Sequence, residues 1–203
     1  MNPTQEMIKR LFLSIAISVA ALIAGTSSVT AAVTRCDGVL QPGTYDTVLV
    51  PKGKNCLVLG PVTVEENVIL QEGASILGVV GVFTVNGNLQ GDGVRRINLF
   101  ANPGVEIHGN VSITGATDAA NLIFVNIGGN LNISDSNGAG IFVEESQVNG
   151  NALFQNNTLK VFNITDDTIV GNLVCNGNDP APNLGSPDTN TVTGQRIGQC
   201  SLP

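Results

Sequence analysis

The chain has 203 residues, a formal net charge of −7 at pH 7 and 12% charged residues. The acidic balance argues against nucleic acid or anionic lipid as a partner bound through bulk electrostatics. One histidine and four cysteines without metal-site spacing argue against zinc and against a Ser-His-Asp triad. The many Gly, Asn, Val and Ile residues suit short strands joined by tight turns and disfavour helices.

The chain begins with a segment typical of a secretory signal peptide. Lys9 and Arg10 precede the apolar run LFLSIAISVAALIAG (11–25), and the small residues TSSVTAA follow. The apolar run is shorter than the roughly 20 residues that a membrane-spanning helix needs. We therefore expect a signal peptide over 1–32 and a secreted mature chain, extracellular or periplasmic, over 33–203. We expect no lipidation, and no membrane insertion after removal of the signal.

A Gly-Asn pair recurs at nearly constant spacing through the centre of the chain. Intervals of 22, 20, 21 and 21 residues separate Asn88, Asn110, Asn130, Asn151 and Asn172. A β-branched residue stands three positions before each asparagine, and an apolar residue follows it directly. Apolar residues on both sides of a fixed corner indicate two short strands that meet at a turn. A third apolar cluster lies midway through each period, so each repeat predicts three strands.

These repeats predict an all-β fold, a right-handed parallel β-helix with about seven turns of ~21 residues. The turns would occupy about 44–175 and a C-terminal cap 176–203; a two-sheet sandwich is the alternative. Equivalent residues of successive turns would stack about 4.8 Å apart, so the asparagines would form a ladder of side-chain amide hydrogen bonds. The glycine before each asparagine is expected to allow a positive φ at the corner.

The cysteines fit this solenoid as two local pairs. Cys36 and Cys56 lie 20 residues apart and Cys175 and Cys200 lie 25 apart, which is about one turn in each case. A disulfide needs Cα atoms about 4.4–6.8 Å apart, which adjacent turns provide. Of the three pairings that four cysteines allow, only Cys36–Cys56 with Cys175–Cys200 suits the stack. We expect one disulfide near each end, protecting open strand edges in an oxidising compartment.

Several phrases resemble a group of bacterial secreted Gly-Asn-repeat parallel β-helix proteins. They are the corner VNGNLQGDG, the repeated Gly-Asn, the ending GNLVCNGNDPAPN…NTVTGQRIGQC and the opening GTYDTVLVPKGKNCLVLG. The likeness covers nearly the whole mature chain. It implies the fold and export; its motifs are structural corners and cysteines, and it implies no activity and no catalytic residue.

Glu145 and Asp166 are the sharpest candidates for a metal or catalytic site. They lie 21 residues apart and fall in the same column of neighbouring predicted turns. Two carboxylates a few Å apart repel each other unless a cation or a shared proton lies between them. The pair therefore suggests a calcium site or a general acid/base pair. The simpler interpretation places both carboxylates, together with their neighbours Glu144 and Asp167, in loops exposed to solvent.

Two further features give weaker candidates. His108 in EIHGN resembles half of the Gly-His-Gly of pectin-cleaving hydrolases, but other repeats place unrelated residues at this position. Arg95 and Arg96 could clamp an acidic glycan, but neighbours on a strand are expected to point to opposite faces. We therefore interpret all three as surface residues and assign no catalytic residue.

The sequence favours an exported, non-enzymatic β-solenoid that acts as a structural or surface interaction module, with extracellular polysaccharide or a surface protein as candidate partners. A polysaccharide lyase or hydrolase acting on acidic glycans is one alternative, and a self-assembling surface protein is another. No cofactor is expected apart from the calcium hypothesis. The chain has no Trp and one Tyr, which weakens the glycan hypotheses, because sugar rings usually stack on these side chains.

Overall fold

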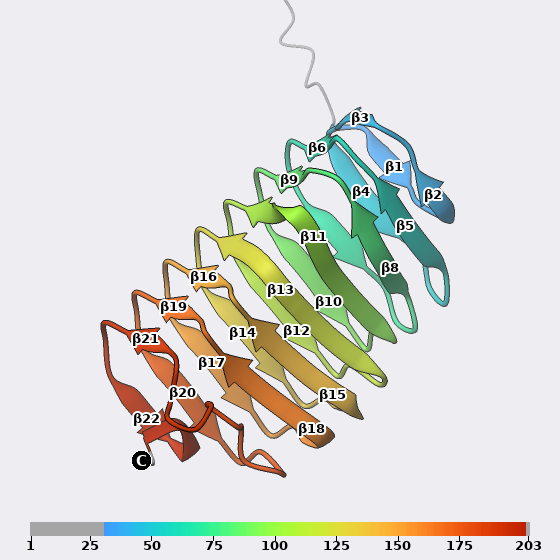
Figure 1. The fold of residues 1–203 in the computed structure, drawn as a ribbon. Coiled ribbons are helices and arrows are strands. Elements are labelled where there is room, and N and C mark those ends of the chain that lie inside the picture. The colour runs from blue at the N-terminus through green and yellow to red at the C-terminus, as the bar shows by residue number, and fades with distance from the viewer. Residues whose placement is uncertain (1–30, 202–203) are drawn as a thin grey trace, which may run out of the picture. The chain divides into compact units, whose positions relative to one another are not determined.

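The computed structural model describes residues 31–201, with backbone only for 101–103, and these residues form a parallel β-solenoid of about eight turns (Figure 1). The predicted fold class is confirmed, and strands on either side of 44–175 account for the additional turn. The predicted signal peptide lies almost wholly outside the described residues. Within 31–201, no helix is long and apolar enough to cross a membrane.

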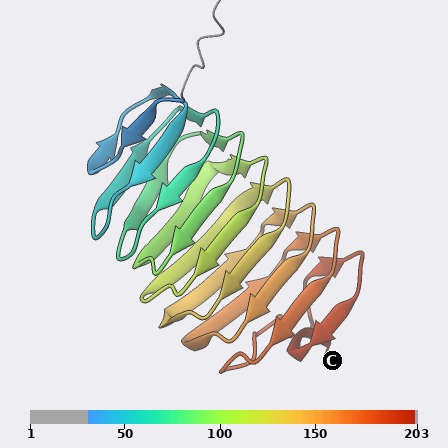
Figure 2. The same ribbon diagram turned by 180° about the vertical axis from the view of Figure 1, so that it is seen from behind.

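One face of the solenoid is a nine-stranded parallel sheet, which we call sheet A (Figure 2). Its strands follow one another in chain order, one from each turn. They are β1 (Val33–Arg35), β4 (Thr47–Val50), β7 (Val68–Leu70), β10 (Leu89–Asp92), β12 (Val111–Thr114), β14 (Leu131–Ser134), β17 (Ala152–Gln155), β20 (Leu173–Asn176) and β22 (Arg196–Gly198).

A second sheet of thirteen strands, sheet B, covers the other two faces. Its long face holds β2 (Gly38–Leu40), β5 (Asn55–Leu59), β8 (Ser75–Val80), β11 (Arg96–Ile107), β13 (Ala119–Ile127), β15 (Asn137–Glu144) and β18 (Thr158–Thr165). Its short face holds the C-terminal ends of β11 and β13 together with β3 (Gly43–Tyr45), β6 (Val62–Val64), β9 (Phe83–Val85), β16 (Gln147–Val148), β19 (Thr168–Ile169) and β21 (Thr191–Val192). Each full turn therefore supplies three strand segments, as the sequence predicts.

The core follows from strict alternation along the strands. In β14, Leu131 and Ile133 are fully buried, and the side chain of Asn132 between them points outward. The register places Ile133 between Ile113 of the preceding turn and Phe154 of the next one. Stacking of like with like thus fills the interior with a continuous apolar column, because each turn buries its inward side chains against its neighbours.

The Gly-Asn corners form a column of hydrogen bonds. Asn88 Oδ1 accepts from both the backbone N–H and the side-chain Nδ2 of Asn110, at 2.8 and 3.1 Å. Equivalent backbone bonds run from Asn67 to Asn172, where Gln195 N–H ends the column. The glycines are needed for a reason other than the expected one. Their φ values are not positive; instead, a Cβ added at Gly109 would lie 2.4 Å from the Gly87 carbonyl oxygen.

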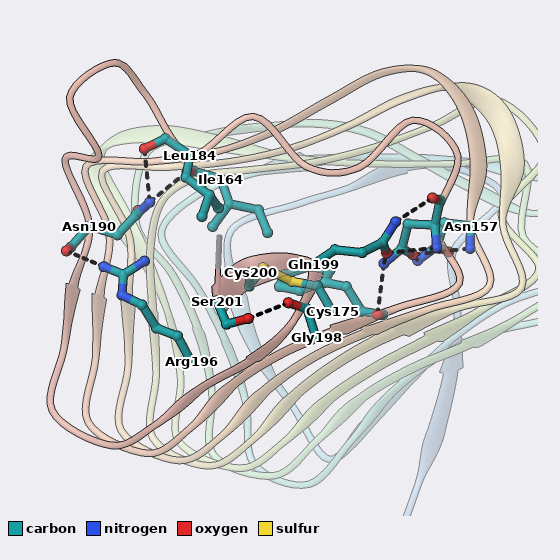
Figure 3. The surroundings of a disulfide bond; sticks show 12 residues. Asn157, Ile164, Cys175, Leu184, Asn190, Arg196, Gly198, Gln199, Cys200 and Ser201 are labelled. Atoms are coloured by element: carbon teal, nitrogen blue, oxygen red, sulfur yellow. Dashed lines mark hydrogen bonds between the residues drawn. A yellow bond between two sulfur atoms is a disulfide. The ribbon is translucent and has the colours of Figure 1, made fainter. Parts of the chain in front are cut away.

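Both predicted disulfides are confirmed. Cys36 and Cys56 have Cα atoms 5.5 Å apart, and Cys175 and Cys200 have Cα atoms 5.3 Å apart. The second bond ties β20 to a single-turn 3₁₀ helix, Gln199–Ser201, at the end of the described chain (Figure 3). Such disulfides indicate an oxidising, extracellular-type environment.

The last turns are closed by a cap loop, residues 177–190, which connects β20 to β21. The loop brings Leu184 over the end of the core, where it is buried. The Nδ2 group of Asn190 donates to the carbonyl oxygens of Ile164 and Leu184, and Arg196 donates to the Asn190 carbonyl oxygen (Figure 3). The loop is therefore held to the core by backbone and side-chain hydrogen bonds together.

Candidate functional site

The outer side of the long face of sheet B is apolar from β2 to β13. Paired residues there carry apolar side chains from β2 to β8 and from β11 to β13: Val39 with Leu57, Leu59 with Val80, and Phe100 with Ile123. We call this surface the apolar face; its members are Val39, Leu77, Val80, Val82 and Phe100, which are exposed, and Leu57, Leu59, Ile123 and Phe124, which are half-buried. The exposed fractions of Val80 and Phe100 are 60% and 52%, so water covers side chains that would favour burial.

One outward column of the apolar face ends at β15. Ile123 pairs with Glu144, and Glu144 pairs with Thr165 of β18, so the same outward column becomes polar within one turn. A neighbouring column carries amides: Asn121 Nδ2 donates to Asn98 Oδ1 at 2.7 Å, and Asn98 Nδ2 donates to the Leu77 carbonyl oxygen. These bonds hold the amides along one side of the apolar face.

Phe124 lies at the corner of β13 in the left-handed backbone region, with φ of 58°. This conformation costs an L-residue with a bulky side chain roughly 1–2 kcal/mol. The ring of Phe124 lies 6.0 Å from the ring of Phe100, measured between centroids, in a tilted arrangement. Part of the apolar face is thus built from a residue whose backbone is strained.

Glu145 and Asp166 occupy equivalent corners of successive turns, directly after β15 and β18. Both are exposed and both have positive φ, 50° and 59°. The Glu145 N–H donates to the Thr165 carbonyl oxygen, which places the two residues in adjacent turns. Within 31–201 no cluster of three or more His, Cys, Asp or Glu residues could hold a metal ion. Calcium takes six to eight oxygen ligands, so this pair would need other donors, and the calcium hypothesis remains a prediction.

The residue after Asp166 has the opposite orientation. Asp167 points into the solenoid with an exposed fraction of 1%, and its Oδ1 accepts from the Ser146 N–H at 2.8 Å. Burial raises the pKa of Asp167 to about 7, the Ser146 hydrogen bond opposes this change, and the charges of Glu144 and Asp166 add to it. Sequence inspection grouped the two aspartates as one solvated pair and missed this inward carboxyl.

Two further ladders lie inside the solenoid, at its other two corners. In one, the N–H groups of Ser136, Asn157 and Asn178 donate to the side-chain oxygen of the next residue of the column, ending at Gln199. In the other, Asp167 N–H donates to Asn190 Oδ1 in the same direction. The first ladder had a sequence signal, because its four members recur every 21 residues.

The weaker candidates are surface residues. His108 is exposed, and its Nε2 lies 3.8 Å from a carboxylate oxygen of Glu106. The expectation that Arg95 and Arg96 point to opposite faces is wrong. Both point outward, because the chain turns a corner there: Arg95 donates to Asn55 and Ser75, and Arg96 forms an ion pair with Asp118.

Two surface depressions in the described part of the chain, 31–201, bring together no acid–base pair. One lies on sheet A, where the side chains of Gln90, Asp92, Ser112 and Thr114 surround it; the other lies on the cap loop. In comparisons with protein-family models, with curated proteins and with solved structures, the chain matches none of them. The function therefore has to be argued from the geometry of this molecule.

Proposed function

We propose that this chain is an exported, non-enzymatic binding module that binds a protein partner through the apolar face. The observation that supports the proposal is that these outward apolar side chains lie on the neighbouring strands β2, β5, β8, β11 and β13. Single exposed apolar residues are ordinary on protein surfaces, whereas contiguous apolar patches on soluble proteins usually mark interaction sites. The signal-like start at 11–25 and the two disulfides support export.

The chemistry of the apolar face favours a protein over a glycan as the partner. Most of its members are aliphatic, and the single Tyr of the chain, Tyr45, is half-buried with its hydroxyl donating to the Gln41 carbonyl oxygen. Aliphatic side chains on a flat sheet suit another apolar protein surface, because close packing of such surfaces removes both from water.

The negative charge of this chain indicates which charge the partner should carry. Glu144 and Glu145 border the apolar face, and the chain has a net charge of −7. Two copies of the chain therefore repel each other at long range, whereas a partner with an apolar centre and a basic rim is attracted. We infer a partner of that kind. The lyase or hydrolase alternative depends on Glu145 and Asp166, and no contact of either carboxylate favours it.

A photo-crosslinking amino acid at Val80, in the mature protein secreted by its own host, tests the proposal. The matched control is Val170, which is 46% exposed and lies between β19 and β20, away from the apolar face. We expect one protein to be crosslinked at Val80 and not at Val170. Purified, that protein should bind the Val80→Lys variant about 30-fold more weakly than wild type, the loss expected at a binding hot spot. Val170→Lys should bind like wild type.

Three results would overturn the proposal. Equal crosslinking at the two positions would show that the apolar face has no specific partner. Crosslinks between two copies of the chain would make it a self-association surface. Crosslinks to a glycan, with affinity lost in a Phe100→Ser variant, would replace the protein partner by a polysaccharide.

A further inference from the structure

Asp167 is the one ladder residue within 31–201 whose side chain can ionise. Its Oδ1 is satisfied by the Ser146 N–H, but its Oδ2 is buried without a hydrogen-bond partner. A buried oxygen without a donor or acceptor is costly, and native proteins retain few of them. The contacts of the neighbouring ladder residues show what this oxygen faces.

At equivalent positions, a donor group points to a carbonyl oxygen of the preceding turn. Ser146 Oγ lies 3.2 Å from Leu122 O, and also 3.0 Å from Glu144 O of its own turn; Asn190 Nδ2 donates to Ile164 O at 2.7 Å. In the other inner ladder, Asn157 and Asn178 donate to Ile133 O and Phe154 O, both at 3.0 Å. Every one of these ladder positions therefore requires a donor as well as an acceptor.

The register identifies the corresponding carbonyl for Asp167. Leu122 pairs with Val143, and Val143 pairs with Ile164. Since the Ser146 hydroxyl lies at Leu122 O and Asn190 donates to Ile164 O, the equivalent carbonyl for Asp167, between them in the column, is that of Val143. An ionised carboxylate has no proton to donate, whereas a carboxylic acid supplies one.

We propose that the Asp167 carboxyl is protonated in the folded solenoid, with its Oδ2–H donating to the Val143 carbonyl oxygen, and that its ionisation loosens the C-terminal turns. Asp167 thereby makes the cap end of the molecule sensitive to pH. This proposal is independent of the apolar face and of any partner that binds there.

The charges around Asp167 act in the same direction. Asp166 follows β18 beside it, Glu144 and Glu145 come from the preceding turn, and the following turn brings Asp188 and Arg196. Arg196 is already paired with Asp188 and bonded to the Asn190 carbonyl oxygen. The side chains packed inside the same turn are apolar: Phe162, Ile164 and Ile169. Apart from the Ser146 N–H, nothing in these surroundings favours a negative charge on Asp167.

The direction of the pH effect follows from the two states of the chain. Burial raises the pKa of Asp167 from 3.8, the ordinary value, to about 7 in the folded protein. Between these values the folded chain holds a proton that the unfolded chain has released, so stability falls as pH rises. The unfolding equilibrium constant should increase by up to about tenfold per pH unit over that window and level off above pH 7.

The cap loop is the part of the fold that should respond. Asp167 N–H donates to Asn190 Oδ1, and the Asn190 side chain holds Leu184 over the core. Loss of the contact to Val143 would displace Asp167 and, with it, the anchor of the loop. After correction for the intrinsic pH dependence of amide exchange, the protection factors of β19 and β21 should be lower at pH 8 than at pH 5, while those of β4 and β7 stay unchanged.

Urea unfolding of the mature protein between pH 5 and pH 8 tests the proposal, together with ¹³C NMR of the Asp167 carboxyl carbon. Wild type should lose stability with rising pH, and the carboxyl should titrate with a midpoint near 7. Asp167→Asn supplies a permanent donor, as Asn157 and Asn178 do, so it should remove most of the slope and stabilise the protein at pH 8. Asp166→Asn, an exposed neighbour, should keep the slope.

The opposite substitution gives a second test. Asn157→Asp places a carboxyl at an equivalent position of the other ladder and should create a second loss of stability with rising pH. A carboxyl midpoint for Asp167 below 5 would overturn the proposal. A slope that persists unchanged in Asp167→Asn would overturn it as well.

Discussion

The two halves of the solenoid fill their inner corners in different ways. In the N-terminal half (31–127), both inner corner columns are apolar: Ala74, Val94 and Ala116 in one, and Val62, Phe83, Val105 and Val125 in the other. In the C-terminal half (128–201), the same columns are polar: Ser136, Asn157, Asn178 and Gln199 in one, and Ser146, Asp167 and Asn190 in the other. The change occurs within a single turn at both corners.

The difference shows two ways of stacking one turn on the next. Apolar corners gain free energy by leaving water, and this gain depends little on exact alignment. Polar corners require each side-chain oxygen to meet one particular N–H, so a fully satisfied column specifies one register. The exterior changes at the same place, since one outward column of the apolar face ends where Ile123 pairs with Glu144. The N-terminal half thus presents the proposed binding surface, and the C-terminal half contains the register-specific ladders and the cap loop.

The largest effect should come from removing one rung of an inner ladder. Asn157→Leu keeps the branching at Cγ but leaves the Ser136 N–H and the Ile133 carbonyl without their side-chain partner, while Asn178 Oδ1 keeps the backbone N–H of residue 157. Orphaned buried groups cost about 1–3 kcal/mol each, so we expect a loss of about 4 kcal/mol in the free energy of unfolding, measured with urea. The matched variant in the apolar half is Val94→Ala, which orphans no hydrogen bond and should cost about 2 kcal/mol. A smaller loss for Asn157→Leu than for Val94→Ala would mean that the ladder is not the stabilising element of its half.

The two disulfides give a comparison between the ends of the solenoid. They close loops of similar size, with sequence separations of 20 and 25 residues. In the chain-entropy description, replacing either pair by serine should therefore cost about 3 kcal/mol. The local consequences should differ, because Gln199 beside Cys200 remains bonded to Asn178.

Hydrogen exchange locates those consequences. Without Cys36–Cys56, protection should fall through β1 and β2 and into the following turn. Without Cys175–Cys200, the loss should be confined to β22 and the 3₁₀ helix. Fraying that extends equally far at both ends would show that the polar ladder adds no local stability.

The strands, the Gly-Asn corners and the disulfides of this fold were predictable from the sequence, whereas the inner polar ladders and the apolar face were not. The Gly-Asn corners stand at a nearly fixed interval, so the strands, the stacking and both disulfides follow from counting. The inner ladders escaped because solenoid interiors are expected to be apolar, although Ser136 and Asn157 stand at the same 21-residue interval. The apolar face escaped because in LIFV (122–125) nothing in the residue types separates inward Leu122 from outward Ile123.

The smallest effect concerns the corner that precedes the first inner ladder. Its left-handed residue is glycine in successive turns of the N-terminal half, for example Gly115 with φ of 65°, but Asp135 with φ of 53° in the first polar turn. The left-handed backbone conformation is strained for any residue with a Cβ atom. Asp135→Gly should therefore stabilise the protein by about 0.5–1 kcal/mol. The exposed contact of Asp135 with Asn156 Nδ2, at 3.3 Å, offsets little of that gain.

The reverse substitution sharpens the comparison between the halves. Gly115→Asn has room for a Cβ, whose nearest atom would be Gly93 Cα at 3.6 Å, so its cost should be the backbone strain alone, about 1 kcal/mol or less. Thermal unfolding of both variants at one pH measures the pair. If Asp135→Gly destabilises the protein, the Asp135 side chain contributes more to the start of the polar half than its hydrogen bond from Asn156 accounts for. The transition between the halves would then depend on the outer corner as well as on the inner ladders.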